Sequence, residues 1–315
     1  MFTVEVHATS HIGRVRKGNE DNYLLLNVAK SKAWTSDQPD GEFVVESQNF
    51  DIDDAGAVMA VSDGMGGALA GEVASTMAVE TVSEKLLDAN GDASSTAEDQ
   101  EHFLINKLYD ATVFANYLIH QQGRDPQYQG MGATFTGIGV TPKAADIIQV
   151  GDSRAYLVRK GIIYQVTKDQ SLVQQLIDAQ QISAEEAETH TLKNVILQAL
   201  GAQNEIYPVS ARVQPYRNDV FLLCSDGLSN KVTAGEMQQI VVDRIDELEN
   251  ACAELVKIAN ENGGEDNITV VLIRFTGDGL PEPDDDGVQI EYIDLGGIHD
   301  TADQLTDEID TAEIP

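Results

Sequence analysis

The chain has 315 residues, a hydrophobic share of 42%, a formal charge of -33 and an isoelectric point near 4.2. This length is enough to bury a full core, and the composition is that of a folded protein. The acidity argues against nucleic acid as a partner, because binding to phosphates needs lysine and arginine to displace counterions.

No part of the sequence approaches the run of about 18 apolar residues that spans a bilayer, and residues 1–10 do not resemble a secretion signal. Cys224 and Cys252 form no C-x-x-C pair, which fits a reducing compartment and excludes a cysteine zinc site. We therefore expect a cytoplasmic protein that does not enter a membrane.

In chain order, residues 31–54 are polar and are predicted to form a long hairpin or loop. Apolar runs predict strands at 58–62, 133–140, 147–150, 155–159, 162–166, 220–225 and 268–275. Their order is not the regular strand-helix-strand of a parallel sheet, and short neighbouring strands with tight turns favour antiparallel pairing. The pattern predicts an α/β sandwich.

Helices are predicted where apolar residues recur every three or four positions. They cover residues 71–87, the stretch with Leu104, Leu108, Ala111, Ala115 and Leu118, and the stretch with Leu248, Cys252, Leu255 and Ala259. Two short helices are expected within 171–190, in a segment that interrupts the strands and suggests an inserted surface subdomain.

From residue 277 onward the chain has no lysine or arginine and stays acidic, which predicts a mobile, solubilising tail over 277–315. The run at 282–287 mimics the start of a calcium-binding loop. Its twelfth position is Ile293, where such a loop needs a bidentate glutamate, so calcium binding is excluded.

Aspartate-glycine pairs stand at several predicted strand ends. These are Asp63-Gly64 after 58–62, Asp226-Gly227 after 220–225, Gly151-Asp152 after 147–150, and Asp266 two residues before 268–275. One such pair is an ordinary turn, since aspartate caps its own backbone and glycine accepts positive φ. Turn chemistry does not require the repetition, nor the nearby run of Arg16, Glu20 and Asp21. We expect the strand ends to converge on one rim and to bind a hard cation.

Oxygen ligands without histidine or cysteine select magnesium, manganese or calcium over zinc. Two such ions, about 3.5 to 4 Å apart, can share a carboxylate and lower the pKa of a bridging water. The expected chemistry is therefore the hydrolysis of phosphoesters.

Five motifs follow one another in the chain. They are Arg16-x-x-Asn19-Glu20-Asp21, Asp63-Gly64-Met65-Gly66-Gly67, Gly151-Asp152-Ser153-Arg154, Ser225-Asp226-Gly227-Leu228 and Gly264-x-Asp266-Asn267. This series resembles that of bacterial PP2C-type phosphatases of the PPM family and spans almost all of residues 1–276. The segment 132–134 is similar to the family's G-x-T strand, and 194–201 to the segment that closes its flap.

The resemblance implies an α+β fold, a four-layer αββα sandwich of two mainly antiparallel sheets flanked by helices. It also implies a phosphatase domain at 1–276 with a flap at about 168–203, followed by the acidic tail at 277–315.

The resemblance further assigns roles around two Mn²⁺ or Mg²⁺ ions. Asp63 would bridge both ions, the backbone carbonyl of Gly64 would bind one, and Asp226 with Asp266 would hold the other. Glu20 and Asp21 would act directly or through water, Asp152 would bind a third, weaker ion, and Arg16 would capture the substrate phosphate.

Two departures from the family pattern stand out. Met65 occupies a position where some relatives have histidine, which leaves metal-bound water as the default proton donor and His190 as a weak alternative. Gln170 replaces the histidine of the usual Asp-His-Ser at the start of the flap. Ser153, Arg154 and Asn267 are expected to be structural.

The predicted function is hydrolysis of phosphoserine and phosphothreonine on proteins by a monomer, with a serine/threonine kinase as its counterpart. The alternative is a protein that keeps the fold and acts by docking partners without turnover. The presence of all three metal aspartates together with Arg16 favours the enzyme.

Overall fold

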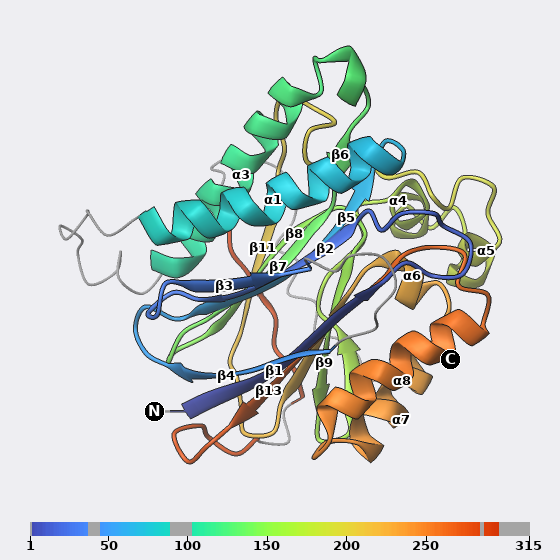
Figure 1. The fold of residues 1–315 in the computed structure, drawn as a ribbon. Helices are drawn as coiled ribbons and strands as arrows, with labels where there is room; N and C mark the ends of the chain where they lie inside the picture. The colour runs from blue at the N-terminus through green and yellow to red at the C-terminus, as the bar shows by residue number, and fades with distance from the viewer. Residues whose placement is uncertain (1, 37–44, 89–102, 284–286, 296–315) are drawn as a thin grey trace.

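The computed structural model describes residues 2–36, 45–88, 103–283 and 287–295. Two antiparallel sheets stack face to face, and helices cover both outer faces (Figure 1). This is the predicted α+β sandwich of four layers. Within the described ranges, no helix combines the length and the apolar character needed to cross a bilayer.

The first sheet has six strands in the order β10-β9-β12-β13-β1-β4. Their bounds are β10 Ile162–Gln165, β9 Arg154–Arg159, β12 Val220–Cys224, β13 Ile268–Thr276, β1 Phe2–His11 and β4 Glu46–Ile52. All strand pairings in this sheet are antiparallel, which confirms the predicted antiparallel pairing.

The second sheet has the order β14-β11-β8-β7-β5-β2-β3, and β6 pairs with β5 beside this path. Their bounds are β14 Glu291–Tyr292, β11 Val209–Val213, β8 Ala145–Val150, β7 Phe135–Val140, β5 Ala57–Met65, β2 Asp21–Asn27, β3 Lys32–Thr35 and β6 Gly132–Ala133. These pairings are antiparallel as well.

Two long helices lie on each outer face. α1 (Ala68–Asp88) and α3 (Phe103–Gln122) pack on the larger sheet, and α7 (Ala234–Asp243) and α8 (Leu248–Glu261) pack on the smaller one. The short helices are η1 (Pro126–Tyr128), α4 (Leu172–Asp178), α5 (Ala184–Glu188) and α6 (Asp226–Ser229).

Three separate cores follow from these layers, one between the sheets and one under each helical layer. Strand β13 serves two of them. Val271 and Ile273 point into the space between the sheets, whereas Val270 and Leu272 point toward α7 and α8. Alternate residues of a strand face opposite sides, so a strand covered on both faces is apolar throughout. This explains the continuous apolar runs in the sequence.

Every predicted strand and helix is present. β1, β2, β11, β14, α6 and α7 were not predicted from the sequence, and β3 and β4 were expected only as parts of a long hairpin or loop. One expectation was wrong: β3 and β4, which flank residues 37–44, belong to different sheets and do not form a hairpin. Residues 37–44 themselves lie outside the described ranges.

The predicted tail also needs correction, because residues 277–283 and 287–295 pack on the domain. Leu280 is only 5% exposed and joins the core between the sheets, and the Arg217 amide donates to the Pro281 carbonyl at 2.9 Å. β14 then pairs with β11, in the register Ala211↔Tyr292. We call residues 277–283 and 287–295 the strap. Val288 and Ile290 pack against the core between the sheets, and Ile293 and Leu295 pack against the core under α1 and α3. The predicted tail residues 284–286 and 296–315 lie outside the described ranges.

Replacing Leu280 by alanine should lower the free energy of unfolding by about 2–4 kcal/mol, because it leaves a cavity in the core between the sheets. Urea denaturation followed by circular dichroism measures the change. The control is Leu192→Ala, since Leu192 is 46% exposed and should cost about 0.5 kcal/mol or less. Equal effects of the two variants would show that the strap contributes nothing to the fold.

Candidate metal centre

Strand ends from both sheets meet at one end of the sandwich and bring the predicted acids together. Asp63, near the end of β5, is paired in register with Asp21 at the start of β2. Asp226 follows β12 as the first residue of α6, and Asp266 lies in the loop before β13. Asp152 follows β8. Charge interactions link Asp63 to the other four carboxylates, so residues up to 245 positions apart in the sequence face one another.

The carboxylates resist full ionisation. Burial raises the pKa of Asp63 well above its usual value, and the charges of Asp21, Asp226, Asp152 and Asp266 raise it further. Burial likewise raises the pKa of Asp226, whose side chain is hydrogen-bonded to that of Asp63. Two carboxyl groups in such contact must share a proton or a cation.

The donor set therefore fits hard divalent cations, since it offers only oxygen ligands and an excess of negative charge. Within residues 2–36, 45–88, 103–283 and 287–295, no three acidic, histidine or cysteine side chains are already arranged to hold an ion. The fit rests on the chemistry of the donors and on their electrostatics.

Asp21 is held by a chain of buried hydroxyl groups. Its Oδ2 atom accepts hydrogen bonds from Ser225 Oγ and Thr269 Oγ1, both at 2.7 Å. Ser10 Oγ contacts Thr269 Oγ1 at 2.7 Å and accepts a bond from Asn19 Nδ2 at 2.7 Å. These partners fix one oxygen of Asp21, and the charges of Asp226 and Asp266 act on the same carboxylate. Ser10 and Thr269 had no predicted role, although a threonine within the apolar run of β13 is a usable signal.

Glu20 and Gly64 lie side by side under the first turns of α1. The Gly64 amide donates to the Glu20 carbonyl at 3.1 Å, and the Glu20 amide donates to Asn267 Oδ1 at 2.8 Å. A methyl group on Gly64 would overlap the backbone carbonyls of Gly71 and Glu20, so the helix can approach the strand this closely only at a glycine. Burial raises the pKa of Glu20, and the charge of Arg16 lowers it.

Arg16 stands at the rim of the cluster. Its Nη2 atom lies 2.7 Å from Asp266 Oδ2, its Nη1 atom lies 3.8 Å from Glu20 Oε1, and its side chain is 44% exposed. Its guanidinium therefore lies at the edge of the acids and is open to solvent. The structure thus brings all eight predicted residues, including Arg16, Gly64 and Asp152, to the same end of the sandwich.

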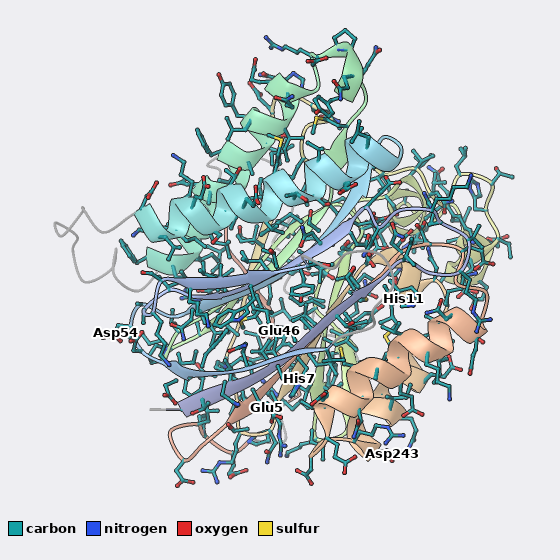
Figure 2. All side chains as sticks on the ribbon, viewed as in Figure 1. Glu5, His7, His11, Glu46, Asp54 and Asp243 are labelled. Atoms are coloured by element: carbon teal, nitrogen blue, oxygen red, sulfur yellow. The ribbon has the colours of Figure 1, made fainter. Side chains whose placement is uncertain are left out.

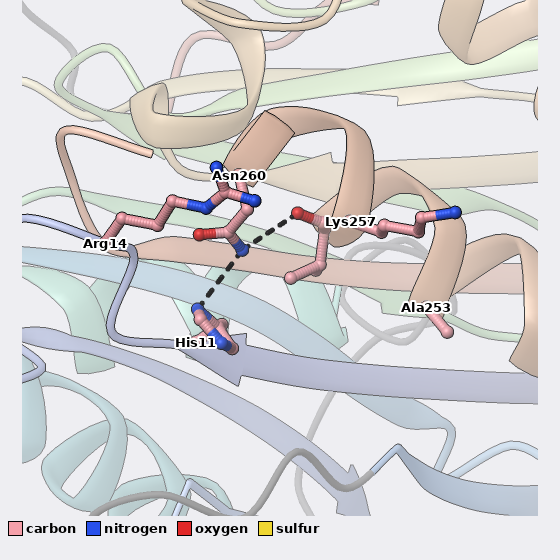
Figure 3. Close-up of a pocket in the computed structure, with 6 residues that line it drawn as sticks. His11, Arg14, Ala253, Lys257 and Asn260 are labelled. Carbon is pink, nitrogen blue, oxygen red and sulfur yellow. Dashed lines mark hydrogen bonds between the residues drawn. The ribbon is translucent and has the colours of Figure 1, made fainter. Parts of the chain in front are cut away.

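The loop that carries Arg16 is fixed from two sides. Asn267 Nδ2 donates to the carbonyls of Ile12 and Gly18 at 2.9 and 3.1 Å, which confirms its predicted supporting role. Behind the loop, the Gly13 amide donates to His11 Nδ1 at 2.9 Å. Asn260 Nδ2 lies 3.3 Å from the same nitrogen (Figure 3). The loop that carries Arg16 is therefore tied at Ile12, Gly13 and Gly18 to β1 and to the Asp266 loop.

Thr134 and Ser153 support Asp63 from behind. The Asp63 amide donates to Thr134 Oγ1 at 2.9 Å, and the Thr134 amide donates back to the Asp63 carbonyl at 2.8 Å. Thr134 Oγ1 also lies 2.7 Å from Ser153 Oγ. The predicted structural role of Ser153 is confirmed. The threonine of the G-x-T segment holds the backbone of Asp63 in place.

The four histidines of the described ranges are engaged elsewhere. His7, which lies near Glu5 on β1 (Figure 2), is bonded to Glu5 and to Ser47 of β4. His11 is bonded to Gly13 and Asn260. His120 contacts the Gly201 carbonyl at 3.0 Å, and His190 accepts a bond from the Leu192 amide within its own turn. None of these contacts involves the carboxylate cluster.

A family model described as Protein phosphatase 2C matches residues 45–270. The chain belongs to the protein phosphatase 2C family. Protein phosphatase PhpP of Streptococcus pneumoniae is 38% identical over 229 residues, which cover 72% of this chain and 89% of PhpP. Serine/threonine phosphatase stp of Listeria monocytogenes is 37% identical over 226 residues, which cover 71% of this chain and 87% of stp.

Solved structures agree with this membership. The Mycobacterium tuberculosis serine/threonine phosphatase PstP/Ppp has a TM-score of 0.68 at 30% identity, covering 87% of this chain and 100% of that one. The PstP catalytic domain in complex with two manganese ions has a TM-score of 0.66 at 29% identity, and the match covers 88% of this chain and 100% of that domain. The chain is accordingly a serine/threonine protein phosphatase with the protein phosphatase 2C fold.

The metal-free protein should lose stability as pH rises from about 5 to 7.5. Burial raises the pKa of both Asp21 and Asp152 to about 7 in the folded state, against about 3.9 in an unfolded chain. Between these values the folded state holds protons that the unfolded state has released, so stability falls with increasing pH. Thermal unfolding in EDTA measures the trend.

Manganese should reverse this dependence, since a cation replaces the proton among the carboxylates. Asp21→Asn should make the metal-free curve less steep, because asparagine does not titrate and Asp152 alone then contributes of the two. A melting temperature in EDTA that is constant or rising from pH 5 to 7.5 would contradict this account of the cluster.

Proposed function

We propose that this phosphatase hydrolyses phosphoserine and phosphothreonine on proteins with a water activated at a pair of Mn²⁺ or Mg²⁺ ions. The observation that carries the proposal is the meeting of Asp63, Asp226, Asp266 and Asp21 at the strand ends with Arg16 at their rim. Cations bound among these buried carboxylates would neutralise their mutual repulsion.

In this proposal Asp63, Asp226, Asp266 and the Gly64 carbonyl would hold the two ions. Glu20 and Asp21 would act on these ions directly or through water, and Asp152 would hold a third, weaker ion. The ions would lower the pKa of a water so that hydroxide is available near neutral pH.

Arg16 has the geometry to bind two oxygens of a phosphate at once, because its guanidinium presents a planar fork of donors. It is exposed and is paired with Asp266, so substrate phosphate would exchange with that carboxylate at the rim. The charge of Arg16 would then offset the negative charge that builds on phosphate oxygens during attack.

Asp63→Asn and Asp226→Asn should each reduce kcat by about 10³-fold or more with Mn²⁺ present, since each removes a charge on which the ion pair depends. Turnover of p-nitrophenyl phosphate and of a phosphothreonine peptide is the measurement, and circular dichroism checks the fold. Native-like turnover by either variant would remove the metal centre from the mechanism. Absence of turnover by the wild-type chain with metal bound would favour the docking alternative.

Arg16→Ala should raise KM for a phosphopeptide about tenfold or more, because the substrate phosphate loses two charge-assisted hydrogen bonds. Arg16→Lys should recover part of the loss. The matched control is Arg14→Ala, since Arg14 belongs to the same loop but lines a separate pocket with Lys257 and Ala253 (Figure 3). Equal effects at positions 14 and 16 would point to loop disorder in place of phosphate binding.

A further inference from the structure

A salt bridge joins the strand that follows Asp152 to the base of the flap, residues 168–203. Arg154 begins β9, and its Nε and Nη2 atoms donate to the two carboxylate oxygens of Asp169 at 2.7–3.1 Å. Its Nη1 atom donates to Tyr156 Oη at 3.2 Å. Because Nε, Nη1 and Nη2 of the planar guanidinium each have an acceptor, Arg154 and Asp169 fix each other's orientation.

A second contact fastens the flap to the turn that carries Asp152. The Gly151 amide donates to Gln170 Oε1 at 2.7 Å, and the Gln170 amide donates to the Gly151 carbonyl at 3.0 Å. Gly151 has φ +102°, and a side chain there would overlap Thr134. Gln170, which departs from the family's Asp-His-Ser, thus forms part of this attachment.

The Arg154–Asp169 pair lines a cavity of about 590 Å³ between the flap and the first turns of α6 and α7. The same cavity is lined by Asp152 and Asp226 and, on the flap side, by residues such as Val173. The pair therefore connects the wall formed by the flap to the wall that carries the acids.

A similar pair at the other end of β9 provides a comparison within the molecule. Arg159 donates through Nε and Nη2 to the two oxygens of Asp219 at 3.0 and 2.7 Å. There the two side chains are 5% and 0% exposed, against 29% and 11% for Arg154 and Asp169. One strand thus carries a fully buried pair near the strap and a cavity-facing pair beside the acids.

We propose that Arg154 is a positioning residue that holds the flap at a fixed distance from the aspartates, so that the cavity accepts the polypeptide flanking the phosphorylated residue. This inference rests on the proposed function. A small aryl phosphate needs only the acids and Arg16, whereas a phosphopeptide also occupies the space that the flap bounds. Loss of the Arg154 fork should therefore affect the two substrates unequally.

The test is the ratio of kcat/KM for a phosphothreonine peptide to kcat/KM for p-nitrophenyl phosphate, at saturating Mn²⁺. Arg154→Lys keeps the charge and loses the fork, and it should lower this ratio about tenfold, as expected for the loss of one or two charge-assisted hydrogen bonds. Asp169→Asn should do the same. The double variant should be no worse than either single one, because both remove the same contact.

The matched control is Arg159→Lys, which removes an equivalent fork from the same strand. It should lower the melting temperature and leave the substrate ratio within about twofold of the wild type. If Arg154 had only a structural role, Arg154→Lys would likewise lower the melting temperature and leave the substrate ratio unchanged. An unchanged ratio in Arg154→Lys, or an equal shift in Arg159→Lys, would overturn the proposal.

Hydrogen exchange gives a readout that does not depend on activity. In both Arg154→Lys and Asp169→Asn, amides of residues 171–178 should exchange faster while those of β13 are unchanged; unchanged exchange in 171–178 would overturn the proposal. A wild-type chain without turnover of p-nitrophenyl phosphate would refute the proposed function, and the exchange experiment would still decide whether the pair holds the flap.

Discussion

The constraint on which the site depends is the repulsion among carboxylates that the fold forces into one buried space. Five aspartates from both sheets interact electrically at one end of the sandwich, and burial adds to the cost of ionising them. The folded chain tolerates this only with protons or cations among the oxygens. Affinity for positive charge is therefore built into the backbone arrangement, before any individual ligand geometry is considered.

Much of the remaining local structure keeps those acids in place. Asn267 ties the loop of Arg16 to the strand after Asp266, Thr134 bonds both backbone groups of Asp63, and Ser225 with Thr269 fixes one oxygen of Asp21. Each contact joins segments that are remote in the chain. Neutral donors suit this task, because they orient a carboxylate without cancelling the charge that attracts an ion.

The architecture was largely predictable because strands such as β5 and β13 are buried on both faces and are therefore apolar throughout. β4 was not predicted as a strand, because only two of its residues, Phe50 and Ile52, are buried and they alternate with exposed polar residues. α7 was missed, although Thr233 and Glu236 form a capping box that is visible in the sequence. The acids of the site were predicted from repeated strand-end motifs, whereas the hydroxyl chain behind Asp21 was not, because its contacts span more than 200 residues.

The strap carries a consequence for the behaviour of the protein in solution. β11 would otherwise offer a row of unpaired amides and carbonyls, which is a template for strands of other molecules. β14 occupies part of that edge, and its exposed Glu291 adds a negative charge there. The acidic segment that suggested an unfolded end should therefore disfavour aggregation. A strand of a second copy would find part of the β11 edge already hydrogen-bonded and would be repelled by the negative charge there.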